Sequence, residues 1–167
     1  MAPKSISDIQ ACGTSLGGGA FGEAWRVGDQ VFKVYKMNRQ GAALMGVQSM
    51  SAAEMRTAAS EWNYFYGRAY GGQFRRLASA TVIRLESGEC VLRTPFVDGT
   101  EMPADVYARS PQKELVVQTL KQIQRQIGDN SAANIRILDG KPVIIDFDCV
   151  TFKNSDAQDA ALKMFGF

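Results

Sequence analysis

Histidine is missing from all 167 residues of this chain. Its absence excludes Ser-His-Asp and Cys-His catalysis, so a general base would have to be a carboxylate, a lysine or a tyrosine. Cysteine is scarce as well, and Cys12, Cys90 and Cys149 lie far apart in the sequence. An odd number at this spacing argues against a disulfide framework and, without histidine, against a zinc site. We therefore expect a protein of a reducing compartment.

Long hydrophobic runs and a large net charge are missing too. No apolar stretch reaches the ~18 residues of a transmembrane helix, and the N-terminus lacks the apolar core of a secretory signal. The net charge of +2 is too small to indicate a nucleic-acid partner, and the densest basic spot, Arg75-Arg76, is expected to be a solvated loop. The length and a hydrophobic content of 46% predict one soluble globular domain.

Three glycines near the N-terminus form the pattern G-x-G-x-x-G: Gly17, Gly19 and Gly22. Such a stretch lets backbone N–H groups approach phosphates closely, although the pattern alone fits a flexible hairpin tip equally well. A dinucleotide-binding fingerprint would continue into a helix. Here residues 23–35 alternate around a Gly-Asp turn and predict two strands instead. We therefore expect a glycine loop between strands that covers the phosphates of a nucleotide.

A lysine in the second of these strands has two interpretations. Lys33 lies among apolar residues, so it is either an ordinary surface-facing lysine or the cation that holds nucleotide phosphates. A phosphate-holding lysine needs a carboxylate to fix its direction. The helix predicted from a capping box at Ser51 to about Tyr66 offers Glu54 and Glu61. Because Glu54 belongs to the cap, we expect Glu61 to be the partner of Lys33; the alternative is that both glutamates are solvated.

The remaining elements of the N-terminal half are a second hairpin and irregular segments. Alternation over residues 81–94 predicts two more strands, which complete an antiparallel α+β lobe. Residues 1–15 are expected to be a polar tail leading into a strand, and residues 37–50 a loop. A proline ends strand pairing just before Phe96 and Val97, whose backbone could hydrogen-bond to an adenine ring.

Helical periodicity returns in the C-terminal half. Ser110 is expected to cap a helix that has a proline at its first position, and apolar residues at helical spacing extend this helix to Ile127. A short helix is expected within residues 100–108 and a final helix over residues 155–165. This long predicted helix ends shortly before Asp129.

The stretch after this helix carries the main candidate chemistry. Asp129 and Asn134 lie in a loop before one predicted strand, and Asp146 ends the next. Asp139-Gly140 between the strands predicts a two-residue hairpin, which would bring the loop and Asp146 together. Phosphoryl transfer needs a group that accepts the proton of the attacking hydroxyl, and hard oxygen ligands for Mg²⁺. We expect Asp129 in the first role and Asn134 and Asp146 in the second; a capped turn and a strand end without function are the alternatives.

These features occur in the order in which they stand in protein kinases. From Leu16 to Asp148 the chain resembles the protein-kinase-like fold, with matching residues at Gly17, Gly19, Gly22, Lys33, Glu61, Asp129, Asn134 and Asp146-Phe147. The resemblance implies a minimal two-lobed α+β fold: an antiparallel sheet with one αC-type helix over about residues 1–97, and a truncated helical lobe over residues 98–167. It also implies ATP and Mg²⁺ as cofactors.

More narrowly, the chain looks like the minimal effector kinases that bacteria inject through type III secretion, the OspG/NleH group and its relatives. The features that carry this likeness are Tyr64-Phe65-Tyr66-Gly67, Leu92-Arg93, Val97-Asp98-Gly99-Thr100 and the abrupt end after Asp146-Phe147. The likeness implies a kinase secreted by a bacterium into the host cell cytoplasm, acting on serine or threonine of a host protein. Some relatives bind ubiquitin-charged conjugating enzymes and others attack a host chaperone, so these are the partner classes it suggests.

The chain departs from the kinase pattern at three places. Ile127 and Gly128 stand where kinases carry His-Arg before the catalytic aspartate, so activation by phosphorylation of a loop is not expected. Ser131 replaces the lysine that serine/threonine kinases place after that aspartate, so one charge on the transferred phosphate is missing. Asp148 replaces the glycine of D-F-G.

Two other functions fit the same residues. Gly128-Asp129 and residues 144–148 also look like the aminoglycoside and choline kinases, which phosphorylate small molecules. Those enzymes carry a large helical substrate lobe, for which the C-terminal part here is short. A pseudokinase that binds a host partner without turnover is the second alternative, ranked below an enzyme because the residues needed for chemistry are all present.

Overall fold

The computed structural model describes residues 2–18, 22–35, 51–147 and 150–152. The chain divides into two compact units: unit 1 contains Met1–Asn63 and Ser79–Phe96, and unit 2 contains Tyr64–Ala78 and Val97–Phe167. The predicted loop over residues 37–50 and the predicted final helix over residues 155–165 lie outside the described ranges. No helix within those ranges is long and apolar enough to cross a membrane.

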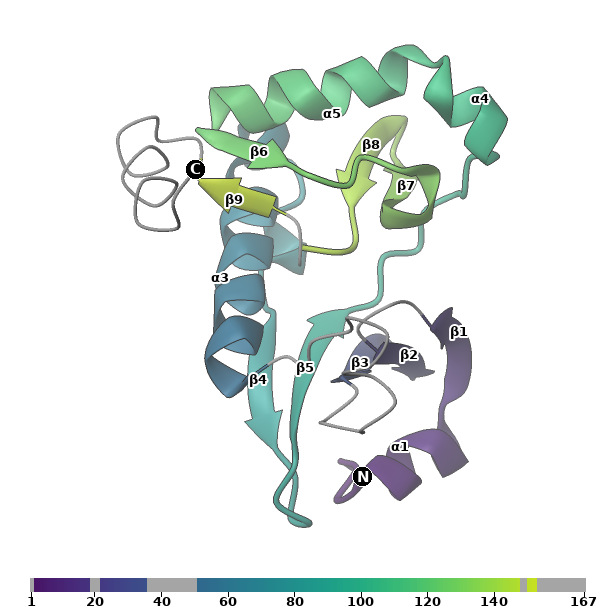
Figure 1. Cartoon of the computed structure of the whole chain (residues 1–167), viewed down its shortest axis with the longest axis vertical. Helices are drawn as coiled ribbons and strands as arrows, with labels where there is room; N and C mark the ends of the chain where they lie inside the picture. Colours follow the sequence, from purple (N-terminus) through teal and green to yellow (C-terminus); the bar gives the residue numbers. More distant parts are fainter. Residues whose placement is uncertain (1, 19–21, 36–50, 148–149, 153–167) are drawn as a thin grey trace, which may run out of the picture. The chain divides into compact units, whose positions relative to one another are not determined.

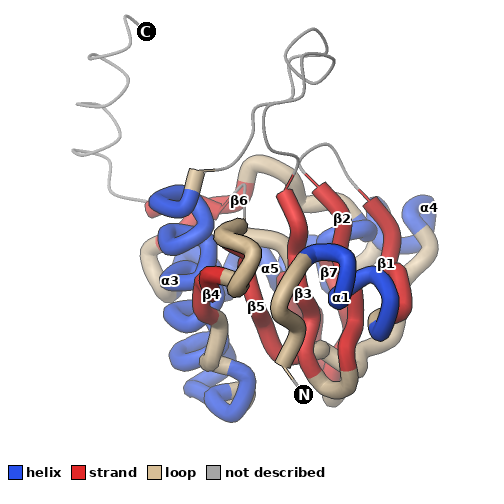
Figure 2. The backbone as a smooth tube through the Cα atoms, turned by 90° about the horizontal axis from the view of Figure 1, so that it is seen from below, coloured by secondary structure: helices blue, strands red, loops and turns tan. Residues whose placement is uncertain are grey.

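Unit 1 is built on a five-stranded antiparallel sheet with the strand order β1-β2-β3-β5-β4 (Figure 2). The strands are β1 (Thr14–Gly18), β2 (Gly22–Val27), β3 (Gln30–Tyr35), β4 (Thr81–Arg84) and β5 (Cys90–Pro95). Both hairpins that the alternating pattern predicts are present, one formed by β2 and β3 and the other by β4 and β5. Pairing of β3 with β5 joins the two hairpins into one sheet. The expected α+β class with an antiparallel sheet is thus confirmed.

Helix α1 (Ile6–Cys12) contributes to the core of unit 1. Its Ile9 is fully buried in a cluster with Phe32 of β3, Val91 of β5 and Leu85. Burial of each such side chain stabilises the fold by about 1.5–3 kcal/mol. The short helix therefore anchors the N-terminus to the sheet.

The expectation of a polar tail over residues 1–15 is wrong, because this segment contains α1. Ser5 caps the helix: the Asp8 amide donates to Ser5 Oγ at 3.1 Å, and the Ser5 amide donates to Asp8 Oδ2 at 3.1 Å. A helix this short, with one buried apolar residue, shows no helical periodicity in the sequence. The capping pattern was its only local signal.

Helix α3 (Ala52–Arg68) begins where its capping box predicts. The Ser51 amide donates to Glu54 Oε2 at 2.6 Å, and the Glu54 amide donates to Ser51 Oγ at 3.2 Å. The helix continues through Gly67, its predicted end, because the first left-handed residue is Tyr70. Its buried apolar residues are Met55, Ala58, Ala59, Trp62, Phe65 and Tyr66.

Unit 2 combines helices with two-stranded ribbons (Figure 1). Besides the end of α3, its elements are the 3-10 turns η1 (Ala69–Gly72), η2 (Arg75–Leu77) and η3 (Ala132–Asn134), helices α4 (Ala104–Ala108) and α5 (Pro111–Gln122), and strands β6 (Arg125–Ile127), β7 (Ile135–Leu138), β8 (Lys141–Ile144) and β9 (Val150–Phe152). Strand β7 pairs with β8, and β6 with β9. The predicted hairpin is confirmed: Asp139 and Gly140 have φ of 49° and 76°, and a type I′ turn requires positive φ at both positions.

The helix predicted from Ser110 to Ile127 is shorter than expected. Helix α5 ends at Gln122, and Gln124 takes a left-handed φ of 57°. Ile127 then lies on β6, opposite Val150. Apolar residues at positions 123 and 127 continue the helical spacing beyond the true end, so the sequence conceals the break.

Candidate functional site

One row of residues runs across all five strands of unit 1. Direct partners in neighbouring strands are Gly17 and Ala24, Ala24 and Lys33, Lys33 and Leu92, and Leu92 and Val82. Residues directly opposite one another share a face of the sheet, so Lys33 stands between two small residues and two apolar ones. A Cβ added to Gly17 would meet nothing within 4 Å. The row therefore places a half-buried cation between small residues on one side and apolar ones on the other, which suits a ligand with an anionic part and an apolar part.

Lys33 itself is held against an aromatic ring. Its Nζ lies 5.1 Å from the centre of the Tyr35 ring, two residues along β3 and on the same face of the strand. Tyr35 is buried and Lys33 is half-buried. Cation–π attraction at this distance restricts the direction of the ammonium. Both interpretations of Lys33 remain open, and its role as the phosphate-holding cation stays a prediction.

The two glutamates of α3 have different surroundings. Glu54 is exposed and accepts the Ser51 amide in the capping box, as the sequence predicts. Glu61 is only 4% exposed. A buried carboxylate is costly unless it is hydrogen-bonded or paired, so the alternative of a solvated Glu61 is wrong. Its pairing with Lys33 stays a prediction.

The glycines of the G-x-G-x-x-G pattern have different structural roles. Gly17 has a φ of 107° at an irregularity in β1, a backbone conformation that other residues rarely adopt. Gly22 is buried, and a Cβ there would lie 2.2 Å from the Val34 carbonyl oxygen. Close packing of β2 on β3 therefore requires Gly22 whether or not it meets a phosphate. Gly19 lies outside the described residues.

The predicted adenine contacts, Phe96 and Val97, fall at the end of unit 1 and in unit 2 respectively. The Phe96 amide donates to the Asp29 carbonyl at 2.8 Å, and the Arg26 guanidinium carbon lies 3.7 Å from the centre of the Phe96 ring. Val97 is buried. One of the backbone groups that we expected to be available to an adenine ring is thus already satisfied within unit 1.

In unit 2, the loop before β7 brings Asp129 and Asn134 together. Asn134 Nδ2 donates to Asp129 Oδ2 at 3.0 Å and to the Asp129 carbonyl at 3.3 Å. The exposed carboxylate is thereby given a fixed direction. Because the amide nitrogen of Asn134 is directed at Asp129, its Oδ1 is the atom that can serve a cation.

The hairpin brings the end of β8 against the same loop. The Ile145 amide donates to the Asn134 carbonyl at 2.9 Å, and Asp146 is the next residue in the chain. Ile144 pairs with Ile135 directly after the loop. Asp146 therefore directly follows the residue whose amide bonds to Asn134, so the hairpin brings it to the loop, as the Asp139-Gly140 turn predicts.

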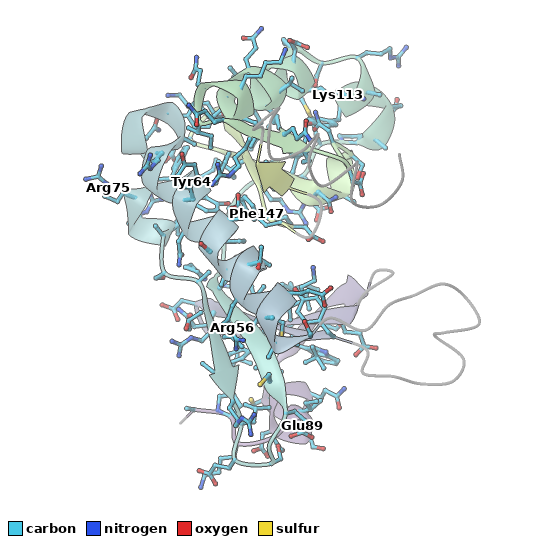
Figure 3. All side chains as sticks on the ribbon, turned by 60° about the vertical axis from the view of Figure 1, so that its left-hand side comes forward. Arg56, Tyr64, Arg75, Glu89, Lys113 and Phe147 are labelled. Atoms are coloured by element: carbon cyan, nitrogen blue, oxygen red, sulfur yellow. The ribbon has the colours of Figure 1, made fainter. Side chains whose placement is uncertain are left out.

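Ile144, two positions before Asp146, and Phe147, directly after it, are anchored to the C-terminal turns of α3. Phe147, which is labelled in Figure 3, is 5% exposed. Its ring centre lies 5.5 Å from that of Phe65 and 6.3 Å from that of Tyr66. The Tyr66 hydroxyl donates to the Ile144 carbonyl at 2.7 Å. Burial raises the pKa of Tyr66 well above its usual value, so the phenol stays protonated and keeps donating. Asp146, which is half-buried, is thus held between two fixed neighbours.

Two side chains that hold the loop were missed by sequence reasoning. Arg136 donates through Nη1 to the carbonyls of Ile135 and Ala133, at 2.9 and 3.3 Å, and its Nη2 lies 2.8 Å from Glu101. Tyr107 of α4 donates to Asn130, the residue after the predicted base. The bonds of Arg136 to Ile135 and Ala133 are local, but no sequence pattern marks them. The contacts Tyr107–Asn130 and Arg136–Glu101 join residues far apart in the chain.

No protein-family model and no curated protein sequence matches this chain. The residues and their geometry must therefore carry the assignment of function.

Proposed function

We propose that this chain is an ATP-dependent phosphotransferase of the minimal protein-kinase-like type. The observation that carries the proposal is the loop in unit 2, where Asn134 directs the exposed carboxylate of Asp129 and its backbone bonds to Ile145 beside Asp146. One carboxylate that can accept a proton thus lies close to an amide and a carboxylate that can bind a cation. This is the division of roles that phosphoryl transfer requires.

The residues fit a magnesium ion. Mg²⁺ prefers hard oxygen ligands and usually takes only one or two carboxylates from the protein. Asn134 Oδ1 and the Asp146 carboxylate would hold it, and the ion would neutralise charge on the phosphates. Packing of Phe147 and the Tyr66–Ile144 hydrogen bond would keep Asp146 in place.

Asp129 would accept the proton of the attacking hydroxyl. Its side chain is exposed, so the hydroxyl of a large acceptor such as a protein can reach it. The donated Asn134 amide stabilises the ionised carboxylate and fixes its direction. Positioning of this kind supplies much of the rate enhancement in phosphoryl transfer, because little covalent chemistry falls to the protein.

Unit 1 would hold the nucleotide. Lys33, at the centre of the cross-strand row, would bind its phosphates, and the buried Glu61 would direct the lysine. Gly17 and Gly19 would let the backbone approach the phosphates, while Gly22 serves strand packing as well. The apolar Leu92 and Val82 and the carbonyl of Phe96, whose amide is already bonded, would receive the adenine ring.

The proposed acceptor is serine or threonine of a host protein. This part of the proposal depends on the resemblance to type III effector kinases, which also suggests delivery into the host cell and a partner such as a ubiquitin-charged conjugating enzyme or a host chaperone. The absence of Arg at position 128 suits an enzyme that is not switched by loop phosphorylation.

The test is transfer from γ-labelled ATP and Mg²⁺ to eukaryotic lysate, with purified wild-type protein and matched variants. Asp129→Asn should lose about a hundredfold or more, the contribution of a general base, and Asp146→Ala should abolish magnesium-dependent transfer. Asp139→Asn is the matched control, because it makes the same change to another exposed aspartate of unit 2. Label on a protein band supports the proposal, and label only on small molecules favours a small-molecule phosphotransferase. No transfer at all, or unchanged transfer by Asp146→Ala, would overturn it.

A further inference from the structure

We propose that Tyr107 is a positioning residue, which acts through Asn130 to hold Asp129 where it can accept a proton. The inference rests on the proposed function of Asp129. It concerns a residue of α4 that lies far from the loop in the sequence and that no motif includes. The contacts that carry it all belong to unit 2.

Asn130 is held at both ends of its side-chain amide. The Tyr107 hydroxyl donates to Asn130 Oδ1, and Asn130 Nδ2 donates to the Lys113 carbonyl at 3.2 Å. Lys113 lies in the first turn of α5 and is labelled in Figure 3. Because a backbone carbonyl can only accept, this second bond fixes which end of the amide faces Tyr107. The loop is therefore tied to α4 and α5 by a single residue.

The other end of the loop has its own anchor. Asn134 Nδ2 donates back to the Asp129 carboxylate, and the Asn134 carbonyl accepts the Ile145 amide. Two residues therefore hold Asp129 in place. Asn134 directs its carboxylate, and Asn130, the next residue, fixes the direction of the backbone at Asp129. Loss of the hydrogen bonds of either Asn134 or Asn130 would let the Asp129 carboxylate move relative to the other groups of the site.

Tyrosine suits this task because it donates under all ordinary conditions. Tyr107 is 1% exposed, and burial raises the pKa of its phenol to about 12. The hydroxyl of Tyr107 therefore stays protonated at neutral pH and keeps donating. A buried ring also has little freedom to turn away from Asn130.

The direct test is Tyr107→Phe, which keeps the buried ring and removes only the donor. A displacement of about 1 Å at a reacting group can cost a hundredfold in rate, so kcat should fall at least tenfold while KM for ATP changes less than about twofold. The matched control is Tyr70→Phe. Tyr70 also has a hydroxyl in unit 2 that donates to a backbone carbonyl, that of Pro142 at 2.6 Å, but the bond does not reach the loop. The Tyr70→Phe variant should keep the wild-type kcat even if its melting temperature falls.

A double-mutant cycle separates positioning from general loss of stability. Asn130→Ala should lower kcat as Tyr107→Phe does, and the double variant should be no slower than Asn130→Ala, because the hydroxyl acts through Asn130. Additive losses, or equal kcat losses in Tyr107→Phe and Tyr70→Phe, would overturn the proposal.

Backbone ¹⁵N relaxation gives a readout that does not depend on turnover. Order parameters of residues 129–134 should fall in Tyr107→Phe and stay at wild-type values in Tyr70→Phe. If the wild-type protein transfers no phosphate, the proposed function fails while this comparison still decides the positioning of Asp129. Unchanged order parameters in Tyr107→Phe would contradict the positioning itself.

Discussion

Replacing Phe147 with alanine should destabilise the protein by about 3–5 kcal/mol, the usual loss for a buried phenylalanine. The ring is almost fully buried, at 5.5 Å from Phe65 and 6.3 Å from Tyr66 between ring centres. Both pairs are tilted, and such pairs contribute about 0.5–1.5 kcal/mol each beyond burial. Phe147→Leu keeps most of the apolar volume and loses both ring pairs, so it should cost about 1–3 kcal/mol.

Urea denaturation followed by circular dichroism would measure these losses as shifts of the midpoint at constant slope. Phe74→Ala is the matched control, because Phe74 is a fully buried ring of the same unit that packs on Tyr70 instead. Its loss of stability should resemble that of Phe147→Ala. Under conditions where all variants are folded, only the Phe147 variants should transfer phosphate more slowly, because Phe147 adjoins Asp146.

Two results would refute this reasoning. A Phe147→Ala variant within about 1 kcal/mol of wild type, the ordinary effect of a point mutation, would contradict the burial of the ring. Equal transfer rates in the Phe147→Ala and Phe74→Ala variants would show that Phe147 supports the fold without holding Asp146.

Three further predictions concern stability. Burial raises the pKa of Tyr66 above the usual 10, so the folded chain keeps a proton that the unfolded chain releases, and the free energy of unfolding should fall as the pH rises above about 10. Denaturation at about pH 8 and pH 11 would measure this fall, and a fall of the same size in Tyr66→Phe would contradict the role of Tyr66. A Cβ on Gly67 in α3 would meet nothing within 4 Å, so Gly67→Ala should stabilise by about 0.5–1 kcal/mol. A Cβ on Gly99 would lie 2.7 Å from that of Arg136, so Gly99→Ala should destabilise by about 1–3 kcal/mol; thermal melts in the reverse order would contradict this assignment.

Elements with a signal carried by neighbouring residues could be predicted from the sequence. The cap at Ser51 and the turn at Asp139-Gly140 are each decided by side chains and backbone within four residues. The end of α5 could not be predicted, because Gln124 gives no sign of its left-handed conformation and Ile127 continues the helical spacing. Helix α1 was missed because it is short and owes its place to the burial of Ile9.

The same distinction applies to the candidate site. A short loop and a tight turn leave few ways to arrange Asp129, Asn134 and Asp146, so their proximity could be expected. The supports of the loop are different. Tyr107 reaches it from α4, and Arg136, which bonds to the loop, is itself paired with the distant Glu101; a single sequence holds no rule for such pairs. Only the packing of the folded chain decides which residues support the loop.

The type I′ turn at Asp139-Gly140 also bears on how the protein folds. All the groups proposed for proton and cation binding lie in one stretch, from Asp129 to Asp146, and closing so short a loop costs little conformational entropy. Hairpins form within about 1–10 μs, whereas pairing of β3 with β5 must join residues far apart in the chain, which slows folding. Pulse-labelled amide exchange during refolding should therefore protect β7 and β8 before β3 and β5. The chain would then form the loop around Asp129 before the strands that place Lys33.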